Sequence, residues 1–121
     1  MTDDTLRALV RATRYEVSPL PPDDPAARDF TLTVEERRSI WRSVAWVVTV
    51  DGHRLMDRDG RFEYGPYGTS EEWIAAHYFD EKTALDLATE YAPTLRNWRG
   101  QAATDVLAAR AAGLAEEADP A

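Results

Sequence analysis

His77 is the residue of this sequence best placed for acid–base chemistry, because polar and aromatic side chains lie on both sides of it. Tyr78 and Asp80 follow it closely, and Trp73 lies just before it. A carboxylate beside an imidazole can orient the ring or favour its charged form, as a general base requires. A histidine that only makes a hydrogen bond at the start of a helix is the commoner alternative. One alternative is therefore that the chain has a small-molecule or enzyme pocket near His77 and Asp80. Under that alternative, the predicted ligand-binding residues are these two with Trp73 and Tyr78.

A second group of side chains that can ligate metals occupies the middle of the chain: Asp51, His53, Asp57 and Asp59. An EF-hand loop needs acids at its first, third and fifth positions, Gly at its sixth and Glu at its twelfth. With Gly60 as the sixth residue, Leu55 is first and Pro66 is twelfth, so the frame fails. Neither histidine has a second histidine at i+4, and cysteine is absent. We expect these acids to lie at turn tips, and we predict no metal site and no cofactor.

Motifs for covalent catalysis are also missing from the sequence. The chain has no Gly-x-Ser-x-Gly elbow and no Ser-x-x-Lys pair, and residues 65–68 lack the lysine of a phosphate-binding loop. Adjacent acidic residues point apart on a strand or a helix, so they are not ready-made acid–base pairs. The sequence predicts no catalytic residue and gives an enzyme no positive support.

Trp98 stands apart from the other aromatic residues because its neighbours are polar. Arg96 precedes it and Arg99 follows it. An exposed tryptophan flanked by arginine is typical of the residues that dominate protein–protein interfaces. Arg96, Trp98 and Arg99 are therefore predicted interface residues.

The predicted sheet is rich in aromatic residues and arginine, a combination that can stack bases and hold phosphates. Binding of single-stranded nucleic acid is a further alternative on this ground. The formal net charge of −8 argues against it, because the field of the whole molecule repels a polyanion. Core packing is the simpler explanation for Trp41 and Trp46.

Hydrophobic periodicity divides the chain into segments. Residues 1–14 have Leu6, Leu9 and Val10 at helical spacing, which predicts an N-terminal helix. Residues 18–29 contain four closely spaced prolines, which predicts a stiff extended loop. From Phe30 apolar residues alternate with polar ones, as in a strand with one buried face.

Residues 30–66 are expected to form an antiparallel β-meander. Residues 41–50 are apolar on both faces, which predicts a central strand, and residues 36–39 are the expected turn before it. Asp51-Gly52 and Asp59-Gly60 are hairpin signals. Residues 65–68 are expected to close the meander as a loop.

Residues 67–118 form the predicted helical half, and residues 119–121 a short tail. Thr69 and Glu72 have the spacing of a capping box, and residues 77–79 can form either the end of that helix or a last strand. Asp80 is positioned to cap a helix that Pro93 ends, and a last helix is expected over residues 102–115. We predict an α+β fold in which a meander of three to five strands packs against one main helix, with N- and C-terminal helices.

Length and composition define the broader class. At 121 residues the chain is expected to be one domain, with no cysteine and no apolar run long enough to span a membrane. Thirteen of its fourteen basic residues are Arg and nineteen residues are Ala, a bias that GC-rich codons favour. These features indicate a cytoplasmic bacterial protein. Residues 67–121 contain four basic and ten acidic residues, so the negative charge lies in the helical half while the sheet region is neutral.

Several short segments resemble small uncharacterised proteins of high-GC actinobacteria. These segments are Tyr15-Glu16-Val17, Leu20-Pro21, residues 31–35, and His77 to Asp80 with Ala84, Leu85, Ala88 and Ala92-Pro93. The resemblance spans about residues 15–107. It implies a cytosolic, soluble protein, and it implies no activity and no catalytic residue.

The missing catalytic motifs and the localised acidity favour one function over the others. We expect a non-catalytic, acidic protein-interaction module, such as a mobile-element accessory protein or an inhibitor of a basic partner. Self-association as a homodimer through a sheet face is the other expected form of interaction. Membrane binding is not expected.

Overall fold

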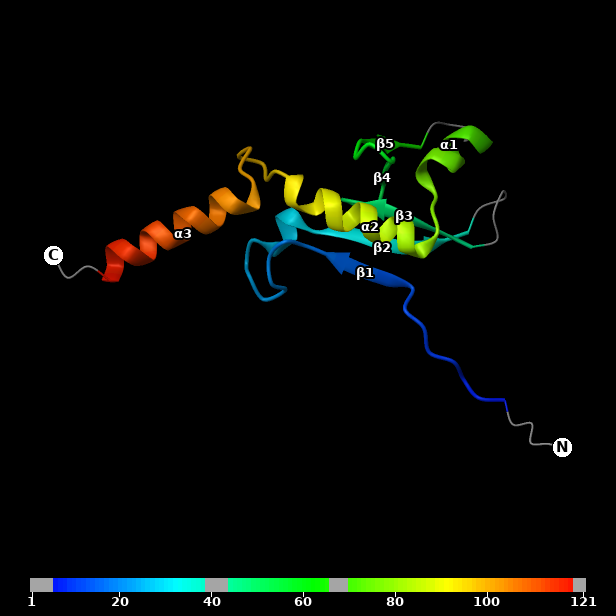
Figure 1. Ribbon diagram of the computed structural model, residues 1–121, viewed down its shortest axis with the longest axis horizontal. Helices are drawn as coiled ribbons and strands as arrows, with labels where there is room; N and C mark the ends of the chain where they lie inside the picture. The colour runs from blue at the N-terminus through cyan, green and yellow to red at the C-terminus, as the bar shows by residue number, and fades with distance from the viewer. Residues whose placement is uncertain (1–5, 39–43, 66–69, 119–121) are drawn as a thin grey trace.

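The computed structural model describes residues 6–38, 44–65 and 70–118, with side chains in the last helix given as far as residue 113. One antiparallel sheet has five strands in the order in which they occur in the chain. The strands are β1 (Arg14–Val17), β2 (Leu32–Arg37), β3 (Ala45–Thr49), β4 (Arg54–Met56) and β5 (Phe62–Tyr64). The helices are α1 (Glu71–His77), α2 (Glu81–Tyr91) and α3 (Ala103–Ala118), with 3-10 turns η1 (Ala27–Phe30) and η2 (Ala92–Thr94). The predicted α+β fold with a meander sheet is confirmed (Figure 1).

Strand β3 lies at the centre of the sheet, as its apolar sequence predicts. All five of its residues are buried, whereas β2 alternates between buried and half-buried positions. Trp46 and Val48 belong to the main core, and Val47 is buried on the opposite face. The predicted residues 41–43 of this strand lie outside the described ranges.

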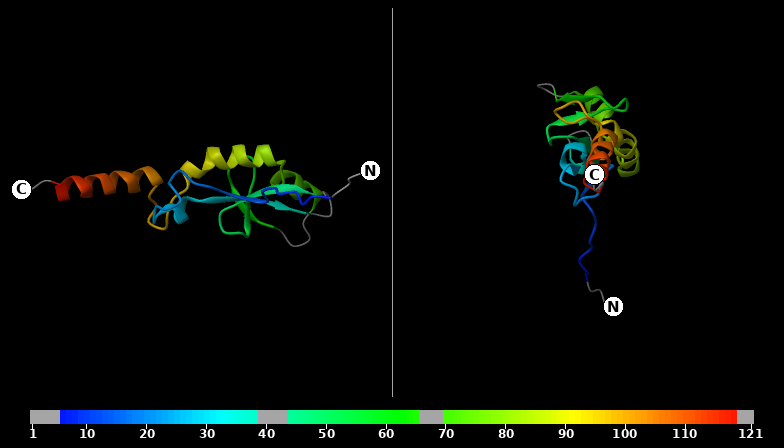
Figure 2. Two further views of the ribbon diagram at one scale, coloured as in Figure 1. Left: turned by 90° about the horizontal axis from the view of Figure 1, so that it is seen from below. Right: turned by 90° about the vertical axis from the view of Figure 1, so that its left-hand side faces the viewer.

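Helix α2 covers one face of the sheet with a stripe of small residues. Ala84, Ala88 and Ala92 are fully or almost fully buried, and they pack in one cluster with Trp46 and Val48. The Asp80 side chain caps the helix by accepting the N–H of Thr83 at 2.7 Å. A helix lined by alanine approaches a sheet closely, so large side chains of the strands fill the space between them. Figure 2 shows α2 lying along one side of the sheet.

The two predicted Asp-Gly hairpin turns are confirmed. Gly52 and Gly60 have φ values of 85° and 82°, which favour glycine. In the first turn Asp51 Oδ1 accepts the N–H groups of His53 and Arg54 at 2.9 and 2.8 Å. Gly60 has a second constraint, because a Cβ built there would lie 2.6 Å from the Tyr91 ring of α2.

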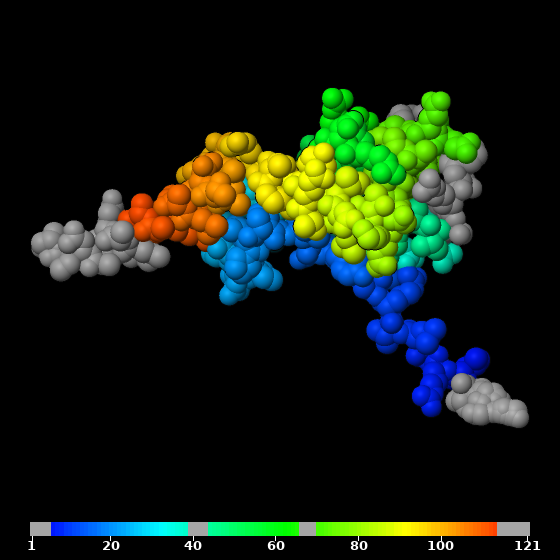
Figure 3. Space-filling view, viewed as in Figure 1, coloured from blue at the N-terminus to red at the C-terminus, as the bar shows by residue number. Residues whose placement is uncertain are grey.

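The predicted N-terminal helix is absent from residues 6–13, which we call the N-terminal arm. The arm has no regular secondary structure, and Leu6, Leu9 and Val10 are 98%, 92% and 98% exposed. A helix this short is unstable in water unless its apolar stripe packs against another surface, and the fold supplies none. Arg11 forms an ion pair with Glu36, but the arm otherwise leads away from the body (Figure 3).

The proline-rich segment also differs from the expected extended loop. Residues 18–29 turn sharply, and Asp24 Oδ1 accepts the N–H of Ala26 at 2.8 Å just before η1. Phe30 therefore belongs to η1 and fills a second small core with Leu20 and Ala103, so β2 begins at Leu32. Strand β2 continues to Arg37, through positions expected to form a turn.

The helical half follows the predicted order with small shifts. Ser70 caps α1 by accepting the N–H of Trp73 at 3.2 Å, while Thr69, predicted for this role, lies outside the described ranges. Phe79 adds an isolated antiparallel bridge to Trp46, so both alternatives for residues 77–79 are partly realised. The expected loop at 65–68 lies mostly, and the tail at 119–121 wholly, outside the described part of the chain.

Helix α3 extends from one end of the molecule (Figures 1 and 2). An ion pair between Arg110 and Asp24 joins it to the proline-rich segment. Within the described residues, no helix is both long and apolar enough to cross a membrane.

Replacing Ala88 with leucine tests the close contact of α2 with the sheet. The added atoms have no space, so Ala88→Leu should lower the free energy of unfolding by about 1–3 kcal/mol. Ala76→Leu makes the same addition at an exposed position of α1 and should change it by less than about 0.5 kcal/mol. Urea unfolding followed by circular dichroism measures both. Equal stability of the two variants would contradict the packing described.

Acid unfolding tests the first hairpin turn. The N–H of Arg54, and secondarily its guanidinium and the N–H of His53, hold the pKa of Asp51 well below its ordinary value of 3.8. Because this pKa is lower in the folded state, the carboxylate stabilises the fold above about pH 4. That contribution is lost as the pH falls from there through the folded-state pKa.

Asp51→Asn keeps the oxygen acceptor and removes the titrating group. Stability of this variant should therefore fall less steeply between about pH 5 and pH 2 than that of the parent chain. Glu90→Gln removes an exposed carboxylate that accepts no backbone N–H, and it serves as the control. A slope for Asp51→Asn equal to that of the parent would show that the turn does not depend on the charge.

Candidate functional site

Trp73 and His77, two of the residues predicted to bind a ligand, lie together on α1. Their rings stack with centroids 4.0 Å apart and planes 15° apart. His77 Nδ1 lies 2.7 Å from the Trp73 carbonyl oxygen, which can only accept, so Nδ1 carries the proton. The His77 residue is only 3% exposed. The helix thus fixes both the position and the tautomer of the imidazole.

Tyr78 and Asp80 have other roles in the structure. The Tyr78 N–H donates to the Ile74 carbonyl and ends α1, while Asp80 caps α2. The N–H of Thr83 is the main reason that the pKa of Asp80 lies below its ordinary value. Two hollows on the described surface are lined instead by residues of β1, β2 and the segments beside them, such as Glu16, Thr33 and Glu35. The four predicted residues are therefore not gathered around either hollow.

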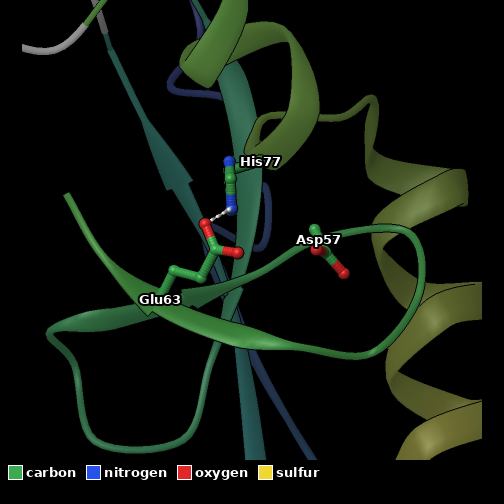
Figure 4. A group of neighbouring side chains, drawn as sticks. All are labelled: Asp57, Glu63 and His77. Atoms are coloured by element: carbon green, nitrogen blue, oxygen red, sulfur yellow. Dashed lines mark ion pairs between the residues drawn. The ribbon is translucent and has the colours of Figure 1, made fainter. Parts of the chain in front are cut away.

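The carboxylates that face His77 come from the β4–β5 hairpin. Glu63 Oε2 lies 3.3 Å from His77 Nε2, and Asp57 contributes a third ligand-type atom within 4.8 Å of the other two. Figure 4 shows the imidazole directed at Glu63, with Asp57 at the end of β4. We call Asp57, Glu63 and His77 the three-residue cluster.

The sequence does not reveal this cluster because its members are distant in the chain. Local spacing groups Asp57 with Asp51, His53 and Asp59, and it does not single out Glu63. The hairpin signal at Asp59-Gly60 places Asp57 just after β4 and Glu63 on β5. The contact between His77 of α1 and this hairpin is a tertiary contact, and no local sequence pattern encodes it.

The predicted interface residues lie in a short ordered loop between η2 and α3. Residues 96–101, which we call the Trp98 loop, are closed by a β-bridge between Arg96 and Ala102. Asn97 Oδ1 accepts the N–H groups of Arg99 and Gln101 at 3.0 and 2.9 Å. The Arg96 guanidinium also donates to the Gly100 carbonyl at 2.8 Å. These bonds give the loop a defined conformation.

Trp98 projects from this loop into solvent. Its residue is 82% exposed, and the Arg99 guanidinium lies 4.7 Å from its ring centroid. A cation over an indole face is attracted by the ring electrons, which helps to orient both side chains.

Replacing Asn97 tests whether its side chain orders the Trp98 loop. Asn97→Ala removes the acceptor of two N–H groups, and amide hydrogen exchange at Arg99 and Gln101 should accelerate about tenfold. Asn97→Asp retains an oxygen acceptor and should preserve the protection. Hydrogen exchange measured by NMR distinguishes the two. Unchanged exchange in Asn97→Ala would mean that other contacts hold the loop.

Comparison with known proteins provides no relative from which a function can be transferred. Neither a protein-family model, a curated protein nor a solved structure matches this chain. Functional conclusions therefore depend on the residues of this chain alone.

Proposed function

We propose that this chain is a non-catalytic protein-interaction module of the bacterial cytosol whose partner is a second copy of itself. The observation that carries the proposal is that the N-terminal arm and the junction of the body with α3 both leave large apolar side chains in water. The absence of cysteine and the excess of arginine and alanine support the bacterial cytosol as its location.

The N-terminal arm supplies the first of these surfaces. Leu6, Leu9 and Val10 are almost fully exposed, and their spacing places them on one face of a helix. Three large apolar residues side by side in water are costly for a monomer. An arm of this kind gains helical structure when a partner covers that face.

The junction between the body and α3 supplies the second surface (Figure 1). Trp98 is exposed on its ordered loop, and Leu107 is exposed one turn into α3. The loop directly precedes α3, and Arg96 lies 3.8 Å from Asp105 in the first turn of that helix. The loop and the start of α3 therefore form one continuous surface at the body end of α3, which we call the α3 end.

The arrangement of the two surfaces favours a symmetric pair. The arm and α3 lie at opposite ends of the long dimension of the molecule (Figures 1 and 2). A two-fold axis perpendicular to that dimension places each arm beside the α3 end of the other copy. The same contact is then made twice, as in most homodimers.

The sheet face opposite α2 is a poorer dimerisation surface than the arm and the α3 end. On β2 the face opposite α2 carries Thr33, Glu35 and Arg37, and the last two form an ion pair at 3.2 Å. On β3 the same face is already buried at Ala45, Val47 and Thr49, so covering it with a second copy gains little. Trp46 is buried beneath α2, which also removes it from any base-stacking surface.

Sedimentation equilibrium of the purified chain tests the proposal. The parent chain should form a dimer, and replacing Leu6, Leu9 and Val10 together with alanine should weaken dimerisation at least about tenfold. Trp98→Ala should weaken it similarly. If the arm contacts Trp98, combining the changes should cost less than the sum of the separate effects.

Tyr64→Ser is the matched control, because Tyr64 is an exposed aromatic residue on β5, outside both surfaces. It should leave the dimerisation constant within about twofold of the parent value. A parent chain that stays monomeric at about 0.5 mM would reject self-association. An arm variant that dimerises as tightly as the parent would reject the arm as the contact.

A further inference from the structure

We propose that Asp57, Glu63 and His77 bind one divalent transition-metal cation, with Zn²⁺ as the representative ion. The inference concerns the β4–β5 hairpin and α1, and it is independent of the proposed self-association. A histidine nitrogen and two carboxylate oxygens from three separate chain positions lie within 4.8 Å of one another, and Figure 4 shows the imidazole directed at Glu63.

The orientation of His77 directs one nitrogen of its ring towards the carboxylates. Its Nδ1–H donates to the Trp73 carbonyl, which leaves Nε2 as the only nitrogen that can ligate. Metal-binding histidines are commonly oriented in this way, by a second hydrogen bond to a backbone carbonyl. Stacking on Trp73 further prevents rotation of the ring.

The buried and unsatisfied Nε2 atom is the second, independent observation. His77 is 3% exposed, and Nε2 makes no hydrogen bond although Glu63 Oε2 lies 3.3 Å away. A lone pair facing carboxylate oxygens is repelled unless a proton or a cation lies between them. Among the described residues, no arginine or lysine forms an ion pair with Asp57 or Glu63.

The spacing of His77 Nε2 and Glu63 Oε2 matches that of two ligands of one ion. Two ligands each about 2.0–2.1 Å from a tetrahedral ion are about 3.3 Å apart. The Nε2–Oε2 distance of 3.3 Å equals that value. Asp57 uses Oδ1 to accept the N–H groups of Asp59 and Arg61, so Oδ2 is available for a cation. Glu63 is half exposed, so its side chain has room to adjust.

The donor set determines the class of cation. Ca²⁺ and Mg²⁺ prefer sites made entirely of oxygen, whereas imidazole with carboxylates suits Zn²⁺ and neighbouring transition metals. Three protein ligands leave at least one coordination position for water or for a donor from another molecule. A cation here would join the end of α1 to the β4–β5 hairpin.

Calorimetric titration of the chelator-treated full chain with ZnCl₂ tests the proposal. We expect saturable binding of one ion per chain and a rise in melting temperature, because the ion binds the folded state. Glu63→Gln and Asp57→Asn should each weaken binding at least about tenfold. The asparagine keeps the Oδ1 acceptor of the turn, so the hairpin should remain folded.

Asp51→Asn makes the same change in the preceding hairpin turn, where Asp51 accepts N–H groups in the same manner. It should leave the affinity for Zn²⁺ within about twofold of the parent value. In ¹⁵N NMR spectra of the parent chain, Zn²⁺ should shift His77 Nε2 strongly and leave Nδ1 protonated. This measurement needs no change to the buried histidine.

Two results would overturn the proposal. The first is the absence of saturable heat and of any Nε2 shift at up to about 1 mM ZnCl₂. The second is Zn²⁺ binding that is equally strong in the parent, Glu63→Gln and Asp57→Asn chains, because the ion then binds elsewhere.

Discussion

Trp46 and Val48, on one face of strand β3, are buried because α2 lies along that face with alanine side chains at the contact. Trp46 and Val48 occupy the space that Ala84 and Ala88 leave free, and β2 completes the same core with Val34. Burial of these apolar groups provides most of the stabilisation expected for a domain of this size. The remaining strands and the short helix α1 are arranged around this contact. The arm and most of α3 are not needed to complete this core.

The β4–β5 hairpin shows how one side chain serves both fold and site. Asp57 accepts N–H groups that define the turn, and the same carboxylate faces His77 across the cluster. Gly60 lets the turn approach Tyr91 of α2, which fixes the hairpin relative to the main helix. Helix α1 then brings His77 over Glu63. The cluster therefore depends on two tertiary contacts rather than on a local motif.

Short sequence patterns predict the structure correctly where local interactions determine the backbone conformation. The Asp-Gly turns, the cap at Asp80 and the apolar centre of β3 all follow from short patterns. Prediction failed at residues 6–13, where helical spacing lacks a surface to pack on, and near Phe30, where a 3-10 turn replaces the start of a strand. The residues around Trp98 were recognised from composition. The three-residue cluster was missed because Glu63 and His77 meet only through the packing of α1.

The proposed dimer joins two exposed surfaces that the main core does not include. These are the arm, with three exposed apolar residues, and the ordered loop with an exposed tryptophan, which lies where α3 leaves the body. NMR of a mixture of isotope-labelled and unlabelled chains measures their contact directly. The account predicts intermolecular nuclear Overhauser effects between the methyl groups of Leu6, Leu9 and Val10 and the Trp98 indole. Observing such effects only within one chain, or none at dimer-forming concentration, would contradict it.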